Sequence, residues 1–247
     1  MPATVAQPVP SAAVRAGGTG TSAAREKGRP VARIVVFGAG GKAGRAIVAE
    51  AASRGHEVVA VVRDTARYAD LAGCGVAVVA GDVTDRSQVA ALVEGADAVV
   101  DAVAPGAGDN PQTFFTAAAN ALVDAVAATG RGRLVAIGLA AYLDVAPGVR
   151  IMDTPGFPAQ FQDFARAHAA ALDVLREAPA TVEWSVVVPA TEFDPQGGRT
   201  GTYRAGGTGL LTDADGVSRI SYRDFAVAVL DEAEQGAHPR THFAVAY

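Results

Sequence analysis

The 247-residue sequence is poor in cysteine and in clustered positive charge. Its one thiol, Cys74, excludes an internal disulfide framework and a cysteine-rich metal site, and it is typical of the reducing cytoplasm. The formal net charge is −5, and no block of lysines or arginines is present to neutralise a phosphate backbone or an anionic membrane. We therefore expect a cytoplasmic protein that binds neither nucleic acid nor a membrane.

Long apolar runs and grouped metal ligands are also missing. No window comes near the roughly 18 consecutive apolar residues that a membrane span needs. The four histidines, at positions 56, 168, 238 and 242, are too dispersed to predict a metal site. No serine, histidine and aspartate are arranged as a hydrolytic triad. We therefore expect neither metal catalysis nor hydrolysis.

The beginning of the chain differs in composition from the rest. Residues 1–31 are rich in alanine, glycine, proline, serine and threonine, and they lack the apolar stretch of a secretory signal. We predict a flexible leader there, with a domain-swapped arm or a partner-binding tail as the alternative. Residues 32–247 are long enough for one sizeable core, so we predict a single domain after the leader.

From residue 32 onwards, short apolar runs alternate with helical stretches. This pattern is typical of βαβ units that feed a parallel sheet, and it predicts an α/β, Rossmann-like, doubly wound fold. Strands are expected at 32–37, 56–62, 76–80, 98–103, 133–138, 184–188 and 242–246. Helices are expected at 41–54, 87–92, 112–128, 160–177 and 222–234. The alternation stops after residue 189, and we expect the glycine-rich stretch 192–218 to carry the substrate side of a site.

Glycines cluster between the first predicted strand and the first predicted helix. Gly38 would permit a tight turn, and Gly44 would let the helix pack closely on the strand. The helix N-terminus adds free N–H groups and the positive end of a dipole, which suit a pyrophosphate. A purely structural turn would not need four glycines, so we predict a dinucleotide site. Its residues are Gly38, Gly40, Gly41, Lys42, Ala43 and Gly44.

Arg63 follows the second predicted strand, where an NAD site usually carries an acidic residue for the ribose 2′-hydroxyl. A guanidinium would instead pair with a 2′-phosphate, because it is planar, permanently charged and bidentate. We therefore predict NADP(H) in preference to NAD(H). Asp64 comes next and leaves NAD open, since a change in loop register could present its carboxylate. Arg45 is either a second phosphate contact or a solvated helix residue.

Two further strand ends are expected to reach the same site. Asp82 and Val83 follow the third strand, where such folds hold the adenine, although Asp82 could instead cap the next turn. The ribose and nicotinamide would pass the end of the fourth strand, at Ala102, Val103 and Ala104. Asp101, within that otherwise apolar strand, is expected to face at most a strand edge.

The catalytic inventory is short. Many short-chain dehydrogenases use Tyr-x-x-x-Lys to protonate a carbonyl. This chain has only Lys27 and Lys42, so no tyrosine has a lysine four residues later on a helix. Free flavin needs no strong protein acid, and quinones behave similarly. Tyr142 is the best candidate for a proton donor or a substrate hydrogen bond, and His168 is a second candidate; packing in a loop and in a helix are the alternatives.

Several segments resemble the NmrA-like, NAD(P)H-binding family of atypical short-chain dehydrogenase/reductases, and within it the group of NADH-flavin reductases. The resemblance covers nearly all of residues 32–247. It rests on GAGGKAG, GHEVVAVVRD, MDTPGFP, EW with the following Pro189-Ala190, FDPQGGRTGTYRAGG, and the final GVSRISYRDFAVAVLDEAEQGAHPRTHFAVAY.

This resemblance implies an NADP(H)-binding Rossmann domain with a small C-terminal cap from about 190 to 247. By position, residues 188–191, which include Pro189 and Ala190, would border the nicotinamide. Residues 199–203 would help to shape the pocket. The implied substrate contacts are Tyr142, Thr191, Phe193 and Tyr203. Where relatives usually read GGAGS after the fifth strand, this chain reads GLAAY at 138–142, so either Tyr142 replaces the serine or the pocket serves another acceptor.

These observations support three hypotheses. The first is an NADPH-dependent oxidoreductase that transfers hydride to a flavin, a quinone or another conjugated acceptor. The second is a pathway-tailoring enzyme that reduces, isomerises or cyclises one specialised metabolite on the same fold. The third is a non-enzymatic NADP-binding redox sensor with a protein partner. A small-molecule substrate is expected for the first two, and the sequence leaves a homodimer open.

Overall fold

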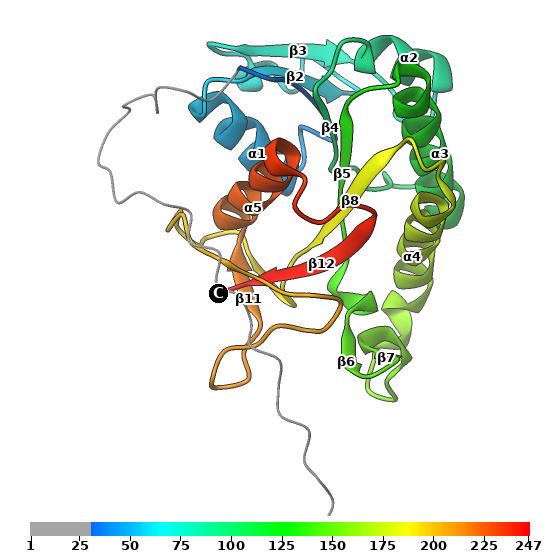
Figure 1. Cartoon of the computed structure of the whole chain (residues 1–247), viewed down its shortest axis with the longest axis vertical. Helices are drawn as coiled ribbons and strands as arrows, with labels where there is room; N and C mark the ends of the chain where they lie inside the picture. The colour runs from blue at the N-terminus through cyan, green and yellow to red at the C-terminus, as the bar shows by residue number, and fades with distance from the viewer. Residues whose placement is uncertain (1–30) are drawn as a thin grey trace, which may run out of the picture.

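Eight strands form the central sheet of the computed structural model, which describes residues 31–247 (Figure 1). They are β1 Arg33–Phe37, β2 Glu57–Val62, β3 Val76–Ala80, β4 Ala98–Asp101, β5 Arg133–Ile137, β8 Glu183–Val188, β10 Arg204–Ala205 and β12 Thr241–Ala246. Their order is β10-β12-β8-β5-β4-β1-β2-β3, and β10 is the only antiparallel member. The predicted leader lies outside the described residues, apart from Val31.

Five α-helices in the described part of the chain cover the two faces of this sheet. They are α1 Lys42–Ser53, α2 Arg86–Val93, α3 Pro111–Thr129, α4 Gln162–Glu177 and α5 Tyr222–Gln235. Helices α1 and α5 pack together on one face, and α2, α3 and α4 form a layer on the other (Figure 1). The α/β, Rossmann-like, doubly wound fold predicted from the alternating pattern is therefore confirmed.

Side chains and glycines near the helix ends explain where these helices begin and stop. Asp85, Asn110 and Ser221 accept backbone N–H groups in the first turns of α2, α3 and α5. Gly130 and Gly236 end α3 and α5 in the left-handed conformation that glycine adopts readily. Helices α1 and α4 have no such side-chain cap at their N-termini.

The strands read as continuous apolar runs because both faces of the sheet are buried. In β1, Val35 and Phe37 pack toward α2, α3 and α4, whereas Ile34 and Val36 pack toward α1 and α5. A strand that is covered on both faces has no polar face and shows no alternation. Each such side chain stabilises the fold by about 1.5 to 3 kcal/mol relative to an exposed position.

The direction of winding reverses at β1. The chain goes from β1 to β2 on one side, and β4 lies on the other side of β1. In open α/β sheets the crevice beyond the carboxyl ends of such a strand pair is the usual place for a ligand. Here that crevice opens beyond Phe37 and Asp101, which are paired across β1 and β4.

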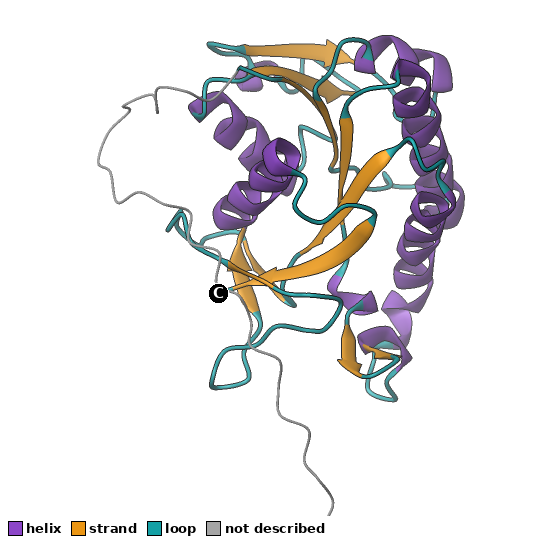
Figure 2. Cartoon of the chain, viewed as in Figure 1, coloured by secondary structure: helices purple, strands orange, loops and turns teal. Residues whose placement is uncertain are grey.

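The C-terminal part has different bounds from the cap that the resemblance implies. Helix α5 packs on α1, and β12 pairs with β8, so both complete the main layers. The segment 189–221 adds β10 to the edge of the main sheet and forms a separate parallel pair of β9 (Glu192–Asp194) and β11 (Arg219–Ser221), which lies beside the end of β12 in Figure 2. Residues 242–246 are buried, and such an apolar run favours a place in the sheet over a place in a cap.

Short elements escape prediction from the sequence. A hairpin of β6 (Asp144–Ala146) and β7 (Val149–Arg150) lies in the long connection between β5 and α4. Four 3-10 helices complete the described part: η1 Ala69–Leu71, η2 Ala140–Tyr142, η3 Ile151–Asp153 and η4 Ala159–Phe161. Two or three residues are too few for an apolar period to indicate structure.

Candidate functional site

An open pocket of about 400 Å³ lies at the carboxyl edge of the sheet, at the switch point. It is formed by the loops that follow β1, β2, β3 and β4. Its lining residues are Phe37, Gly38, Gly40, Gly41, Val61, Val62, Arg63, Asp64, Arg67, Tyr68, Gly81, Asp82, Val83, Ala102, Val103, Ala104 and Phe114. The structure therefore brings together most of the residues that the sequence predicts to hold a dinucleotide.

Backbone crowding explains the glycine loop. Gly38 has φ +75°, and a Cβ there would lie 2.3 Å from the carbonyl oxygen of Ala102. A Cβ on Gly44 would lie 2.1 Å from the carbonyl oxygen of Gly38. The Gly41 N–H donates to that same carbonyl at 3.0 Å and closes the turn. Side chains at 38 and 44 would thus push α1 away from β1 and β4.

The N-terminus of α1 has no local acceptor from a side chain. Gly41 is its N-cap, no side chain bonds to the first turn, and the first turn contains no acidic residue. The first N–H groups of a helix lack partners within the helix, and the dipole makes this end positive. Gly40 and Gly41 also line the pocket without a Cβ, so backbone N–H groups are accessible to an anion.

Two arginines line the β2 end of the pocket. The Arg63 side chain is 62% exposed, and its guanidinium lies 3.6 Å from the carboxylate of Asp109. The guanidinium of Arg67 lies 5.5 Å from the centre of the Tyr68 ring. Asp64 accepts the backbone N–H groups of Ala66 and Arg67, each at 3.1 Å, so its carboxylate caps this turn. Where the chain leaves β2, the pocket therefore carries two arginines, with the carboxylates of Asp64 and Asp109 beside them.

Sequence reasoning missed Arg67, Tyr68 and the part of the loop after β4 that holds Gly106 and Asp109. Arg67 lies four residues beyond Arg63, and that spacing in one loop was the available signal. Gly106 and Asp109 come from a loop distant in sequence. The Gly106 N–H donates to the Asp109 carboxylate at 2.6 Å, and a Cβ on Gly106 would lie 2.9 Å from the Arg63 guanidinium. Nothing in the sequence around either residue indicates this contact.

Asp82 does two things at the end of β3. Its carboxylate accepts the backbone N–H of Thr84 at 2.9 Å and the Thr84 hydroxyl at 2.7 Å, so it caps the local turn. The residue also lines the open pocket beside Val83. The N-cap of α2 itself is Asp85. The turn cap considered for Asp82 is therefore present, and the adenine contact stays a prediction.

Arg45 is not part of the open pocket. Its guanidinium binds both carboxylate oxygens of Asp70, at 2.5 and 3.2 Å, and donates to the carbonyl of Gly40 at 3.3 Å. Lys42, at the start of the same helix, is exposed and faces a separate surface hollow on the outer side of α1, where Arg45 also lies. The position of Arg45 outside the open pocket does not support the alternative that it is a second phosphate contact.

A second, inner cavity of about 20 Å³ lies behind the end of β4, between the sheet and helices α3 and α4. Asp101, Tyr142 and His168 bring the polar groups of its lining, and the other lining side chains are apolar. Val103 lines both this cavity and the open pocket. The two catalytic candidates from the sequence are therefore close together, with ring centres 6.0 Å apart, but they line the inner cavity and not the open pocket.

Burial shifts the protonation of all three groups. It raises the pKa of Asp101 to about 6, with the Val103 N–H opposing the change at 3.2 Å from the carboxylate. It lowers the pKa of His168 to about 4, so this ring is neutral at pH 7. It raises the pKa of Tyr142 well above its usual value, with the nearby Leu139 backbone opposing the change, and within residues 31–247 the buried hydroxyl makes no well-formed hydrogen bond.

The predicted substrate residues of the segment 189–221 bond mainly within the protein. Thr191 donates its hydroxyl to the Ser218 carbonyl at 3.2 Å. The Phe193 ring stacks on Tyr222 at 3.7 Å. The Tyr203 hydroxyl donates to Asp231 at 3.0 Å, and the residue is buried in the core beneath α5. None of them lines the open pocket, and neither do Pro189 and Ala190, which are buried just beyond β8.

Ionic contacts tie this segment to α1 and α5. Arg199 binds both carboxylate oxygens of Glu50, at 2.8 and 2.9 Å. Burial by itself pushes the pKa of Glu50 up, but hydrogen bonds from Arg199 and Arg54 outweigh it and lower the pKa below its usual value. Asp224, fully buried, accepts the N–H groups of Thr200 and Gly201 at 2.8 and 2.7 Å. These contacts span up to 149 residues, and no pattern in the sequence indicates them.

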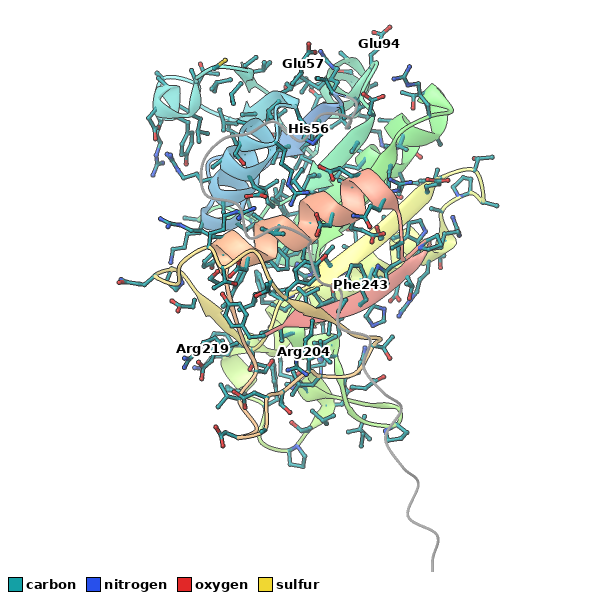
Figure 3. The ribbon with its side chains drawn as sticks, turned by 60° about the vertical axis from the view of Figure 1, so that its left-hand side comes forward. His56, Glu57, Glu94, Arg204, Arg219 and Phe243 are labelled. Carbon is teal, nitrogen blue, oxygen red and sulfur yellow. The ribbon has the colours of Figure 1, made fainter. Side chains whose placement is uncertain are left out.

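The histidines do not gather at one place. His56 lies at the start of β2, where its Nε2 is 2.8 Å from Glu234 (Figure 3). His238 stacks on Phe243 at 3.7 Å, and His242 packs against the Tyr142 ring at 5.6 Å. Across residues 31–247, no three histidine, cysteine, aspartate or glutamate side chains are grouped as metal ligands. Within that range no helix combines the length and apolar character that a membrane crossing requires.

The fold, the pocket at the switch point and the glycine loop define a dinucleotide-binding α/β protein. Comparison with known proteins agrees. The sequence profile of a family described as NAD(P)H-binding matches residues 38–233. The uncharacterized protein YwnB of Bacillus subtilis is 36% identical over 215 residues, which cover 86% of this chain and 97% of that protein.

Two solved structures extend the comparison. A Streptococcus pneumoniae protein provisionally named an NADH-flavin reductase is 32% identical, with a TM-score of 0.77, over 87% of this chain and 99% of that one. A Burkholderia pseudomallei protein provisionally named as exported is 37% identical, with a TM-score of 0.77, over 88% of this chain and 100% of that one. The chain therefore belongs to the NAD(P)H-binding family of atypical, NmrA-like short-chain dehydrogenase/reductases, a family of oxidoreductase enzymes.

Proposed function

We propose that this protein is an NADPH-dependent oxidoreductase that transfers hydride to a flavin, a quinone or another conjugated small molecule. The observation that carries the proposal is the open pocket, where a glycine loop and an uncapped helix N-terminus face two arginines. The name of the Streptococcus relative, which refers to NADH and flavin, supports the reaction class. When bound, the reduced nicotinamide would supply a hydride to an acceptor beside it.

The lining residues fit the parts of a dinucleotide. The pyrophosphate would lie on Gly38, Gly40 and the first N–H groups of α1, which belong to residues 42–44. Side chains at 38 and 44 would collide with the backbone of residues 38, 39, 102 and 103, so both glycines keep α1 close to the strand ends, where its N-terminus can face this ligand. We assign the adenine to Asp82 and Val83. The ribose and nicotinamide would follow Ala102, Val103 and Ala104 toward Pro189 and Ala190.

The charges at the β2 end favour NADPH over NADH. A 2′-phosphate there would meet Arg63 and Arg67, both of which line the pocket. Asp64 accepts two backbone N–H groups of its own turn through Oδ1, so only Oδ2 remains to accept a ribose 2′-hydroxyl. The carboxylate that neutralises Arg63, Asp109, is partly exposed and 3.6 Å away, so a phosphate could replace it.

The acceptor would lie beyond β4, β5 and β8, with the segment 189–221 on its outer side. Thr191 and Phe193 come from this segment and remain our proposed contacts. Tyr203 has another role, because its hydroxyl bond to Asp231 holds the segment on α5. A cytoplasmic location remains a prediction from the sequence, which leaves a homodimer open.

Turnover with several acceptors tests the proposal. Purified protein is mixed with NADPH or NADH, then FMN, a quinone or a conjugated carbonyl compound is added, and the absorbance of the reduced nicotinamide is followed. We expect faster oxidation of NADPH than of NADH with at least one acceptor, and a loss of this preference in Arg63→Ala. Arg86→Ala removes an exposed arginine paired with Asp124 outside the pocket, and it should behave as the wild type. Binding of NADPH without oxidation by any acceptor would contradict the proposal and favour a redox sensor.

A further inference from the structure

The inner cavity places an unusual carboxyl directly behind the open pocket. Asp101 is the last residue of β4, and Ala102 and Val103, which follow it, line the open pocket. Its carboxylate accepts one hydrogen bond, from the Val103 N–H at 3.2 Å, and forms no ion pair within the described residues. Val103 lines both hollows, so the inner cavity adjoins the place assigned to the nicotinamide.

The surroundings of Asp101 hold no opposing charge. Helix α3 contributes Phe115 and Ala119, and β5 and β8 contribute aliphatic side chains. The titratable groups that line the same cavity are the hydroxyl of Tyr142, from η2, and the ring of His168, from α4. His168 is neutral at pH 7 because burial lowers its pKa to about 4, and the Tyr142 hydroxyl stays protonated. Burial therefore keeps a proton on Asp101 up to a pH of about 6.

The size of the cavity fits one water molecule. Its volume is about 20 Å³, and a buried water needs roughly 10 to 15 Å³ with two to four polar partners. The lining offers the Asp101 carboxyl, the Tyr142 hydroxyl and the imidazole of His168. The buried Tyr142 hydroxyl makes no well-formed hydrogen bond in the described part of the chain, which is costly unless a water satisfies it.

We propose that Asp101, through one water held in this cavity, supplies the proton that a conjugated carbonyl acceptor takes up together with hydride. This inference rests on the proposed function and narrows its substrate class. Hydride transfer to free flavin can end at the reduced anion and needs no protein acid. Reduction of an unsaturated carbonyl leaves an enolate that must be protonated.

Atoms and electrons balance in this step. The β-carbon of the acceptor gains a hydride from the reduced nicotinamide, which leaves oxidised, and the electron pair of the carbon–carbon double bond moves to form the enolate. The enolate gains a proton from the cavity water, which takes one from the Asp101 carboxyl. The Asp101 carboxylate is then reprotonated from solvent. Tyr142 and His168 position the water and keep their own protons.

The test compares Asp101→Asn with wild type on two acceptors between about pH 5 and pH 9. With a conjugated enone and NADPH, the wild-type rate should fall about tenfold per pH unit above roughly pH 6. The rate of the variant should be about 100-fold lower, and it should not show this fall with pH. With FMN, the two should agree within about twofold. Tyr142→Phe should reduce the enone rate less, because it removes one partner of the water. Asp124→Asn, an exposed carboxylate paired with Arg86, is the matched control and should change neither rate.

A second readout does not depend on turnover. The carboxyl resonance of isotope-labelled aspartate, absent in Asp101→Asn, should titrate at about pH 6 in the protein without cofactor. A value in the usual aspartate range, equal pH profiles for wild type and variant, or flavin reduction without any enone reduction would each overturn the inference while leaving the proposed function intact. Failure of the wild type to bind NADPH would overturn both.

Discussion

The two hollows on either side of Val103 are built on opposite principles. The open pocket places arginines on exposed loops and leaves a helix N-terminus uncapped, so its charges stay solvated and available to a ligand. At the inner cavity Tyr142 is buried and Asp101 and His168 are half-buried, and this burial shifts their pKa values. The solvated arginines of the open pocket suit the binding of an anion. A carboxyl whose ionisation is disfavoured by burial, such as Asp101, suits the retention of a proton.

The largest expected effect comes from filling the glycine loop of the open pocket. In Gly44→Val the new side chain would begin 2.1 Å from the Gly38 carbonyl and 2.8 Å from Ala39 Cα, so α1 must move. We expect a loss of about 3 kcal/mol or more in the free energy of unfolding and no detectable NADPH binding. Urea unfolding and fluorescence titration measure these quantities. Gly156→Ala changes an exposed glycine whose added methyl group would have nothing within 4 Å, so this control should leave both unchanged.

At the inner cavity we expect a change in stability of the opposite sign, because Asp101→Asn should raise the free energy of unfolding. Folding raises the pKa of this carboxyl from 3.8 to about 6, so the native state holds a proton that the unfolded chain releases. Stability therefore falls as pH rises from about 4 to about 6 and stays lower above that range. The asparagine variant escapes this loss, and at pH 8 it should be more stable by up to about 3 kcal/mol. Urea unfolding at pH 8 and near pH 4 checks this; an equal gain at both values would contradict burial of the charge.

Arg63→Ala should weaken NADPH binding without harming NADH binding. Hydrogen bonds to a charged group contribute about 1.5 to 3 kcal/mol, so we expect the Kd for NADPH to rise roughly 10- to 100-fold. The Kd for NADH should change by no more than about twofold, because NADH has no 2′-phosphate. Fluorescence titration at fixed ionic strength measures both. A matching loss for the two nucleotides would mean that Arg63 does not read the 2′-phosphate.

The smallest expected effect is a gain, from Asp109→Asn. This change keeps an acceptor for the Gly106 N–H but removes the carboxylate that lies 3.6 Å from the Arg63 guanidinium. Exposed pairs contribute about 0.2 to 1 kcal/mol, so NADPH should bind about 1.5- to 5-fold more tightly at low salt. Weaker binding would show that Asp109 holds Arg63 in place and does not compete with the ligand.

The open pocket can be predicted well from the sequence because its determinants are local. Gly38, Gly44 and Arg63 stand at fixed distances from the ends of β1 and β2, and an apolar run followed by glycines can be recognised without knowing the rest of the fold. The same locality explains the accuracy of the long helices and strands. The sequence alone leaves the role of Asp64 open, because its hydrogen bonds within one turn depend on the conformation of the loop.

The inner cavity and the segment 189–221 depend on contacts between distant elements. The sequence shows Asp101 as a carboxylate in an apolar strand, but its partners come from η2 and α4, and no pattern within β4 points to them. Position alone assigns Tyr203 to the substrate, whereas Asp231, 28 residues later, binds its hydroxyl. Burial and pairing of this kind follow from packing, which a single sequence does not specify.

Binding of the two nucleotides to the wild-type protein tests the central claim most directly. The purified full chain is titrated with NADPH and with NADH, and the fluorescence of the reduced nicotinamide is followed at two salt concentrations. We predict that NADPH binds more tightly than NADH and that the difference shrinks as salt screens Arg63 and Arg67. Equal affinity for the two nucleotides would contradict recognition of the 2′-phosphate by Arg63 and Arg67. A failure to bind either nucleotide would contradict the dinucleotide site itself.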